Sequence, residues 1–88
     1  MAMHFDLTDM QLMVNISEVN SLTKGAERSF LSLPAASNRI KNLENSLGTA
    51  LLYRNSQGVT LTLSGEAFVR HAHIVLRQLE HLRGDISE

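Results

Sequence analysis

The sequence contains no cysteine and no tryptophan, only one proline, and few aromatic residues, which make up 5% of its 88 positions. Without cysteine the chain forms neither a disulfide nor a thiolate zinc site, which suits a reducing cytoplasm. It also has no run of 18 apolar residues and no signal-peptide layout, so we expect a soluble, cytoplasmic chain with no place in a membrane. The scarcity of aromatic residues in a chain that is 43% hydrophobic favours aliphatic helix packing in one small domain.

A surplus of positive charge is also missing from the chain as a whole, because its formal net charge is −1. That balance by itself argues against a nucleic-acid partner. The cations are nevertheless concentrated in residues 23–59, which hold five Lys and Arg against Glu27 and Glu44, a local charge of +3. Residues 1–22 hold three acids and no Lys or Arg. A nucleic-acid surface is therefore expected only in the middle of the chain, and one copy should bind weakly.

Residues 32–48 predict one helix with clear signals at both ends. Ser32 suits the N-cap, Pro34 the first turn, and Gly48 the left-handed position past the helix end. Apolar residues recur at spacings of 4, 3 and 4 and must face a core: Ala36, Ile40, Leu43 and Leu47. The residues of the opposite face are short, polar or cationic: Pro34, Ser37, Asn38, Lys41 and Asn45. Such a face suits the major groove of DNA, and the alternative from this helix alone is an ordinary solvated face.

A first helix is predicted at the start of the chain. Thr8 and Gln11 fit a capping box, and Asn20 suits a left-handed helix end. The apolar side of this helix consists of Leu7, Met10, Met13, Val14 and Ile16.

A second, short helix follows from the N-cap Ser21 to Arg28. Its small residues Gly25 and Ala26 indicate the close approach of another helix, because glycine inside a helix costs about 1 kcal/mol relative to alanine and needs a packing reason. The break at residues 30–32 leads directly into the central helix. This order is typical of a helix-turn-helix.

The periodicity changes after Gly48. Residues 50–54 and 59–61 predict two short strands, and 55–58 the turn between them. A hairpin directly after a recognition helix is a wing, whose tip would reach an adjacent minor groove or the backbone. Arg54 is placed for a phosphate, and the alternative is a solvated surface cation.

Thr62 caps a long last helix, predicted from Leu63 to about Ile86. Its apolar residues recur every 3.5 positions in a seam of Phe68, Ala72, Val75, Leu79, Leu82 and Ile86. Much of so long a helix should project beyond a small domain, so a second copy, antiparallel or parallel, is its simplest partner. The alternative is a seam that packs only on the first helix.

No catalytic constellation stands out. His71 and His73 are two positions apart on a helix and so point to different faces, unlike a helical zinc pair, and His81 has no convincing partner. We find no glycine-rich phosphate loop and no Ser/His/Asp arrangement, and we expect no enzyme, no metal and no cofactor. The main alternative to DNA binding is a winged helix used for protein association.

Over nearly its whole length the chain resembles the N-terminal DNA-binding domain of the LysR-type transcriptional regulators. The matching residues of the helix-turn-helix are Ser21, Gly25, Ala26, Glu27, Arg28, Ser32, Pro34, Ala35, Ser37, Ile40, Lys41, Leu43, Glu44, Leu47 and Gly48. Those of the wing and the next cap are Leu51, Arg54, Gly58, Val59, Leu61, Thr62, Gly65, Glu66 and Ala67. Cap, proline, core stripe and wing all occur in register, which makes the match specific.

The resemblance implies a mostly α-helical fold with a small β-hairpin wing: a winged helix-turn-helix DNA-binding domain at residues 1–61 and a linker and dimerisation helix at 62–88. It implies sequence-specific binding of double-stranded DNA in the bacterial nucleoid, with recognition helix 33–47 in the major groove and wing 54–59 at the minor groove or backbone. It also implies a homodimer on an inverted-repeat operator, with a tetramer of the full-length regulator and contact with RNA polymerase as further options. Because a ligand-sensing domain follows in the family, the chain is expected to be a fragment.

The resemblance also assigns roles to individual residues. Major-groove contacts fall to Pro34, Ser37, Asn38 and Lys41. Phosphate contacts fall to Thr23, Arg39 and Arg54, and wing contacts to Ser56 and Gln57. Ser32 and Leu33, at the start of the recognition helix, complete the predicted DNA-binding set. The predicted dimerisation residues are the six of the seam.

Several positions depart from the family pattern. Leu33 replaces the usual glutamine and offers only apolar contact, such as to a thymine methyl. Asn38 replaces the usual arginine and can pair with adenine, while Arg39 stands where glutamine is common. Ser29 replaces a leucine, and neighbouring Phe30 is expected to fill the gap. These changes affect the expected operator and leave the expected fold unchanged.

Overall fold

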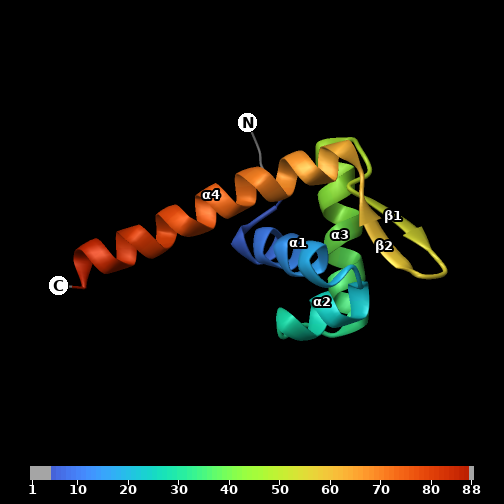
Figure 1. The fold of residues 1–88 in the computed structure, drawn as a ribbon, viewed down its shortest axis with the longest axis horizontal. Coiled ribbons are helices and arrows are strands. Elements are labelled where there is room, and N and C mark those ends of the chain that lie inside the picture. Colours follow the sequence, from blue (N-terminus) through green and yellow to red (C-terminus); the bar gives the residue numbers. More distant parts are fainter. Residues whose placement is uncertain (1–4, 88) are drawn as a thin grey trace.

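The computed structural model describes residues 5–87, so the ends of the two predicted units, residues 1–4 and 88, lie outside the described residues. Its elements in order are α1 (Leu7–Val19), α2 (Leu22–Arg28), α3 (Leu33–Leu47), β1 (Leu52–Asn55), β2 (Gly58–Leu61) and α4 (Leu63–Ile86). Helices α1, α2 and α3 pack together, and the hairpin and the free end of α4 project at opposite ends of the molecule (Figure 1). The predicted winged helix-turn-helix is confirmed.

Helix α1 begins earlier than its predicted cap. Asp6 is the N-cap: its carboxylate accepts from the Asp9 N–H at 3.1 Å, and the Asp9 carboxylate accepts from the Asp6 N–H at 3.0 Å. The predicted capping box of Thr8 and Gln11 is therefore wrong, because the reciprocal pair lies two positions earlier. Asn20 ends the helix in the left-handed region with φ 53°, as predicted.

The core is aliphatic and draws on every element. Its largest fully buried side chains are Leu12, Met13, Ile16, Ile40, Leu43 and Leu51. Two predicted core positions are wrong: Leu7 and Leu47 are exposed, Leu47 by 40%. Both occupy a terminal position of their helix, beyond the layer where the helices meet. Leu12 was absent from the predicted apolar side and is wholly buried.

Gly25 allows α1 and α2 to touch. A Cβ at this position would collide with the Ile16 side chain and lie 3.0 Å from the Ile16 Cα. The close approach predicted from Gly25 and Ala26 is therefore confirmed, and it explains why glycine stands inside a short helix.

The turn between α2 and α3 is organised by polar bonds. The Ser29 hydroxyl donates to the Gly25 carbonyl at 2.8 Å and accepts from the Asn15 amide at 2.9 Å. Phe30 has a positive φ of 59° and is 96% exposed, so the prediction that it fills the gap beside Ser29 is wrong. The ring of Phe30 therefore lies in solvent, and the side chain that contacts Ser29 is Asn15.

The wing is a tight antiparallel hairpin. Leu52 pairs with Leu61 and Asn55 with Gly58, which leaves only residues 56–57 in the turn. The predicted four-residue turn and the predicted strand start at residue 50 are wrong. Strand β2 reaches the turn because Gly58, with φ 133°, still pairs with Asn55. Strand β1 begins only at Leu52, next to the point where the N–H groups of Leu51 and Leu52 donate to Glu44.

Helix α4 belongs to the core only along its first half. Thr62 is its N-cap, as predicted, and accepts from the Gly65 N–H at 2.9 Å. Gly65, Val69 and Ala72 are buried against the rest of the chain. The predicted seam is thus divided: its first members pack within the protomer, whereas Leu82 and Ile86 are exposed on the projecting half (Figure 1).

Candidate nucleic-acid interface

The polar side of α3 faces solvent because its apolar side is buried in the core. Ala36, Ile40 and Leu43 are each 0% exposed. Ser32 caps the helix by accepting from the Ala35 N–H at 3.2 Å. The residues of the outer side that are exposed include Leu33, Pro34, Asn38 and Lys41, and Ser37 is half-buried. The structure therefore places the predicted major-groove residues on one accessible face.

The wing adds a cation to the same face. Arg54 of β1 lines an open polar hollow with five residues of α3: Pro34, Ser37, Asn38, Lys41 and Glu44. Ser56 and Gln57 are exposed at the wing tip, where the Gln57 N–H donates to the Asn55 side chain at 2.8 Å. The fold thus brings Arg54 of the wing next to side chains of α3 that precede it in the sequence.

The cations of the central region are not equivalent. Arg28 is paired with Glu18 at 2.9 Å. Within residues 5–87, Lys24, Lys41 and Arg54 make no ion pair, so their ammonium and guanidinium groups are available to an anion. Thr23 is exposed in the first turn of α2. Lys41 and Arg54 are the two available cations that share the hollow.

Arg39 is held on the other side of α3. Its guanidinium donates to Asp9 at 3.0 Å and to Asp6 at 3.2 Å, and its side chain is only 35% exposed. The bond to Asp9 raises the pKa of Arg39 above its usual value. The bond from the Asp9 N–H, followed by the bond from Arg39, lowers the pKa of Asp6. Arg39 therefore joins α3 to the start of α1, a contact that sequence reasoning missed.

This cluster makes the folded state sensitive to acid. We expect Asp6→Asn to lower the thermal midpoint at neutral pH, with a deficit that disappears on acidification. Because the folded state lowers the Asp6 pKa below its usual 3.8, the carboxylate stabilises the protein above that pH, and the stabilisation is lost as the pH falls through the folded pKa. Asparagine is also a good N-cap, so the substitution removes mainly the charge.

Thermal melts of both proteins between about pH 7 and pH 2.5 would measure this difference, since they span the ordinary carboxyl pKa. Asp85→Asn removes the same charge at an exposed position near the end of α4, where the carboxylate forms no ion pair with any of residues 5–87, and it serves as the control. A deficit of Asp6→Asn that stays constant down to the lowest pH would contradict the assignment.

Glu44 was not predicted as a site residue. Its Oε2 accepts from the Leu51 N–H at 2.7 Å and from the Leu52 N–H at 3.2 Å, at the root of the wing. The available signal was an acidic residue on an otherwise neutral or cationic helix face. Periodicity alone did not reveal that the two amides lie within its reach.

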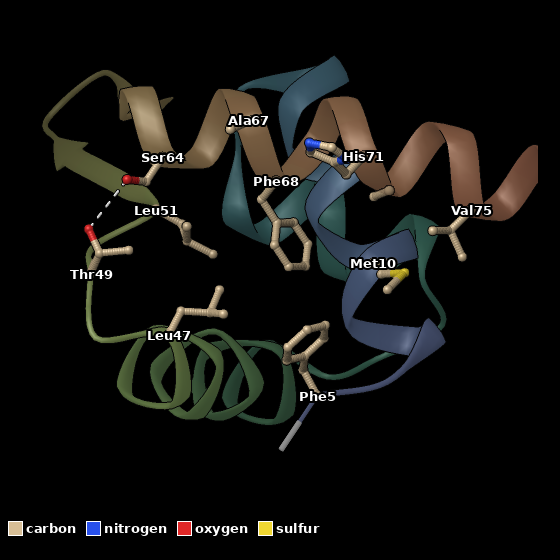
Figure 2. Close-up of a pocket in the computed structure, with 11 residues that line it drawn as sticks. Phe5, Met10, Leu47, Thr49, Leu51, Ser64, Ala67, Phe68, His71 and Val75 are labelled. Carbon is tan, nitrogen blue, oxygen red and sulfur yellow. Dashed lines mark hydrogen bonds between the residues drawn. The ribbon is translucent and has the colours of Figure 1, made fainter. Parts of the chain in front are cut away.

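A second exposed feature is an apolar pocket of about 390 Å³ beside α4. Figure 2 shows the rings of Phe5 and Phe68 at its centre, with Leu47, Met10 and Val75 around them. The two rings meet edge to face with centroids 5.8 Å apart. The exposed Leu47 and the partly buried Phe68, one of the seam residues, thus belong to the same apolar surface.

Residues 5–87 contain no group of three His, Cys, Asp or Glu side chains that could hold a metal ion. No helix in that part of the chain is both long enough and apolar enough to cross a membrane.

A recognition helix and a β-hairpin that share one exposed, cation-bearing face define a winged helix-turn-helix protein. The sequence model described as "Bacterial regulatory helix-turn-helix protein, lysR family" matches residues 7–66. The chain belongs to this LysR family, which confirms the predicted resemblance.

Individual relatives agree with this assignment. The chain is 34% identical over 82 residues to the HTH-type transcriptional regulator YkuM of Bacillus subtilis, covering 93% of this chain and 28% of that protein. It is 33% identical over 78 residues to the Hca operon transcriptional activator HcaR of Escherichia coli, covering 89% of this chain and 26% of that protein. The chain thus spans between 26% and 28% of the length of these curated relatives. The crystal structure of the BenM DNA-binding domain with catB site 1 DNA matches with a TM-score of 0.88 and 30% identity, over 94% of this chain and 92% of that one.

Proposed function

We propose that this chain binds double-stranded DNA sequence-specifically, as the DNA-binding domain of a LysR-type transcriptional regulator. Helix α3 enters the major groove, and the wing follows the backbone or the minor groove. The observation that carries the proposal is the single hollow that Lys41 and Arg54 share with the polar residues of α3. The BenM domain, which is similar to this chain over 94% of its length, is bound to DNA in its crystal structure.

The exposed groups divide into those that read bases and those that bind the backbone. Asn38 can bond an adenine edge in two places, and Leu33 can contact a thymine methyl. Lys41, which the resemblance placed in the major groove, is proposed instead to neutralise a phosphate beside that groove, and Arg54 neutralises another. Thr23 donates to a phosphate at the start of α2, and the wing tip adds polar contacts. Arg39 was also predicted to bind a phosphate, but its Nη1 is bound to Asp6 and Asp9, so we propose that Lys41 and Arg54 supply the main phosphate contacts. The proposed function is DNA binding and not catalysis, and membership of the LysR family supports this proposal.

Two substitutions on α3 test this division on a duplex first selected from a random pool. Lys41→Ala is expected to weaken binding to all sequences and to lower the salt slope by about one, whereas Asn38→Ala is expected to relax the preference at particular base pairs by about 1–3 kcal/mol. Equilibrium titrations across salt concentrations and operator variants measure both effects. Arg77→Ala, an exposed cation on the free half of α4, is the control and should bind like the wild type. Wild-type protein without salt-dependent DNA binding would instead favour a protein-association module.

We also propose that the chain acts as a homodimer through α4. The support is the apolar stripe of its projecting half, where Val75, Leu82 and Ile86 are exposed and Ile86 is 74% accessible. Val75 lies at the edge of the apolar pocket, so the stripe and the pocket form one continuous surface (Figure 2). A twofold dimer would present two α3 helices to an inverted repeat. The proposed boundary between the DNA-binding unit and the linker helix lies at Thr62, the α4 N-cap.

A further inference from the structure

We propose that Glu44 is a positioning residue that directs the wing, and with it Arg54, toward the DNA contacted by α3. This inference rests on the proposed DNA binding. It adds an acidic residue, which itself repels phosphate, to the machinery of an anion-binding face.

The presence of a carboxylate in this hollow requires a reason other than DNA contact. Glu44 lines the hollow together with Lys41 and Arg54, where a negative charge opposes the approach of a phosphate. Glu44 forms no ion pair with either cation among residues 5–87. Its Oε2 instead accepts two backbone N–H groups, from Leu51 at 2.7 Å and from Leu52 at 3.2 Å. Such bonds to an ionised acceptor are stronger than neutral ones, so the contact is firm.

The two bonds act at the place where the direction of the wing is decided. Leu51 and Leu52 are buried at the start of the hairpin, 1% and 7% exposed. Within residues 5–87 these are the bonds that tie the wing root to a side chain of α3. The other bonds to the hairpin lead elsewhere. Thr62 donates from its N–H to the Leu51 carbonyl at 3.0 Å and from its hydroxyl to the Ala50 carbonyl at 2.7 Å. In β2, the Val59 N–H donates to the Asn20 carbonyl at the end of α1 at 3.3 Å. Thus the backbone carbonyl groups at the wing root are bonded to the N-cap of α4, and the backbone N–H groups are bonded to Glu44.

The orientation of Leu52 determines that of Arg54. Side chains two positions apart on a strand point to the same face of the hairpin. Because Leu52 is buried toward the core, Arg54 points to the same side, where it joins Lys41 in the hollow. Rotation of the wing about its root would carry Arg54 away from Lys41. Glu44 opposes that rotation from within the recognition helix itself.

A double-mutant cycle between Glu44 and Arg54 tests the inference. Glu44→Ala and Arg54→Ala are each expected to weaken binding to the selected duplex by about tenfold, the loss that suits one charged hydrogen bond, and to lower the salt slope by about one. The double variant should bind like either single variant, because Arg54 is already misplaced when Glu44 is absent. Glu44→Gln should bind as well as the wild type or better, because its amide oxygen still accepts both N–H groups and the repelling charge is gone. Glu80→Ala, an exposed acid on the free half of α4, is the matched control and should change nothing.

Hydrogen exchange supplies a second readout that does not need DNA. The Leu51 and Leu52 amides should exchange faster in Glu44→Ala, and equally in the near-isosteric Glu44→Met, while Glu44→Gln keeps them protected. The Met variant serves if the Ala variant fails to fold. If Arg54→Ala costs the same with and without Glu44, or if the two amides stay protected in Glu44→Met, Glu44 does not position the wing. If the wild-type protein shows no salt-dependent DNA binding, the proposed function itself is overturned.

Discussion

Leu79→Asp is expected to convert the proposed dimer into a monomer and to weaken binding to a two-half-site operator by about 100-fold, the lower end of the gain from two linked sites. Leu79 lies in the middle of the α4 seam, between Val75 and Leu82. A dimer would bury the new carboxylate among aliphatic side chains without a partner, and burying an unpaired charge is far more costly than losing one apolar contact. Sedimentation equilibrium would report the oligomeric state, and titrations with one-half-site and two-half-site duplexes would report the affinity.

The comparison of the two duplexes locates the effect. Binding to a single half-site should change little, because Leu79 lies on the projecting half of α4, away from the α3 face. His81→Asp is the control: it introduces the same charge at an exposed position two residues away, about 200° around the helix. It should remain a dimer. An intact Leu79→Asp dimer with a normal circular dichroism spectrum would place the interface elsewhere.

Gly65→Ala is expected to cause a large loss of stability. A Cβ at Gly65 would collide with the Leu51 carbonyl oxygen and lie 3.0 Å from its carbonyl carbon. The obstacle is buried backbone at the wing root, so it cannot turn aside as a side chain would. Overpacking of this kind costs about 1–3 kcal/mol or more. For a domain of this size, each kcal/mol lowers the thermal midpoint by about 4–8 °C, so we expect a fall of roughly 10 °C.

Gly84→Ala is the matched control on the same helix. Among the described residues, no neighbouring atom lies within 4 Å of a Cβ at Gly84, so alanine there should be neutral or stabilising by up to about 1 kcal/mol through its higher helix propensity. Thermal melts followed by circular dichroism would compare the two variants directly. Equal midpoints for Gly65→Ala and Gly84→Ala would show that α4 can move away from the wing root without loss.

Most helix boundaries were predictable because the signals for them are local. Ser21, Ser32 and Thr62 each cap a helix by accepting from an N–H three residues later, a bond that depends only on neighbouring residues. Asn20 and Gly48 adopt the left-handed conformation expected at helix ends. The seam of α4 and the outer face of α3 likewise follow from helical periodicity.

The wrong predictions share a different cause. Thr8 and Gln11 fit the pattern of a capping box, but the N-cap is Asp6, which is also bound by Arg39 of α3. Leu47 followed the apolar period, yet the helix ends there, and the residue lines an exposed pocket. Phe30 is hydrophobic, but the left-handed backbone of the turn points it to solvent.

The amino-acid sequence by itself determined the order of the elements, their caps, and which face of α3 is polar, because these depend on contacts within three or four residues. Only the tertiary structure decided which charges remain available for DNA. Arg39 is bound by Asp6, 33 positions away, whereas Lys41 and Arg54 stay unpaired within residues 5–87. Likewise, Glu44 meets two amides seven and eight residues on, beyond the end of its own helix. Such pairings depend on how whole helices and strands pack against one another, and sequence periodicity does not give the distances between them.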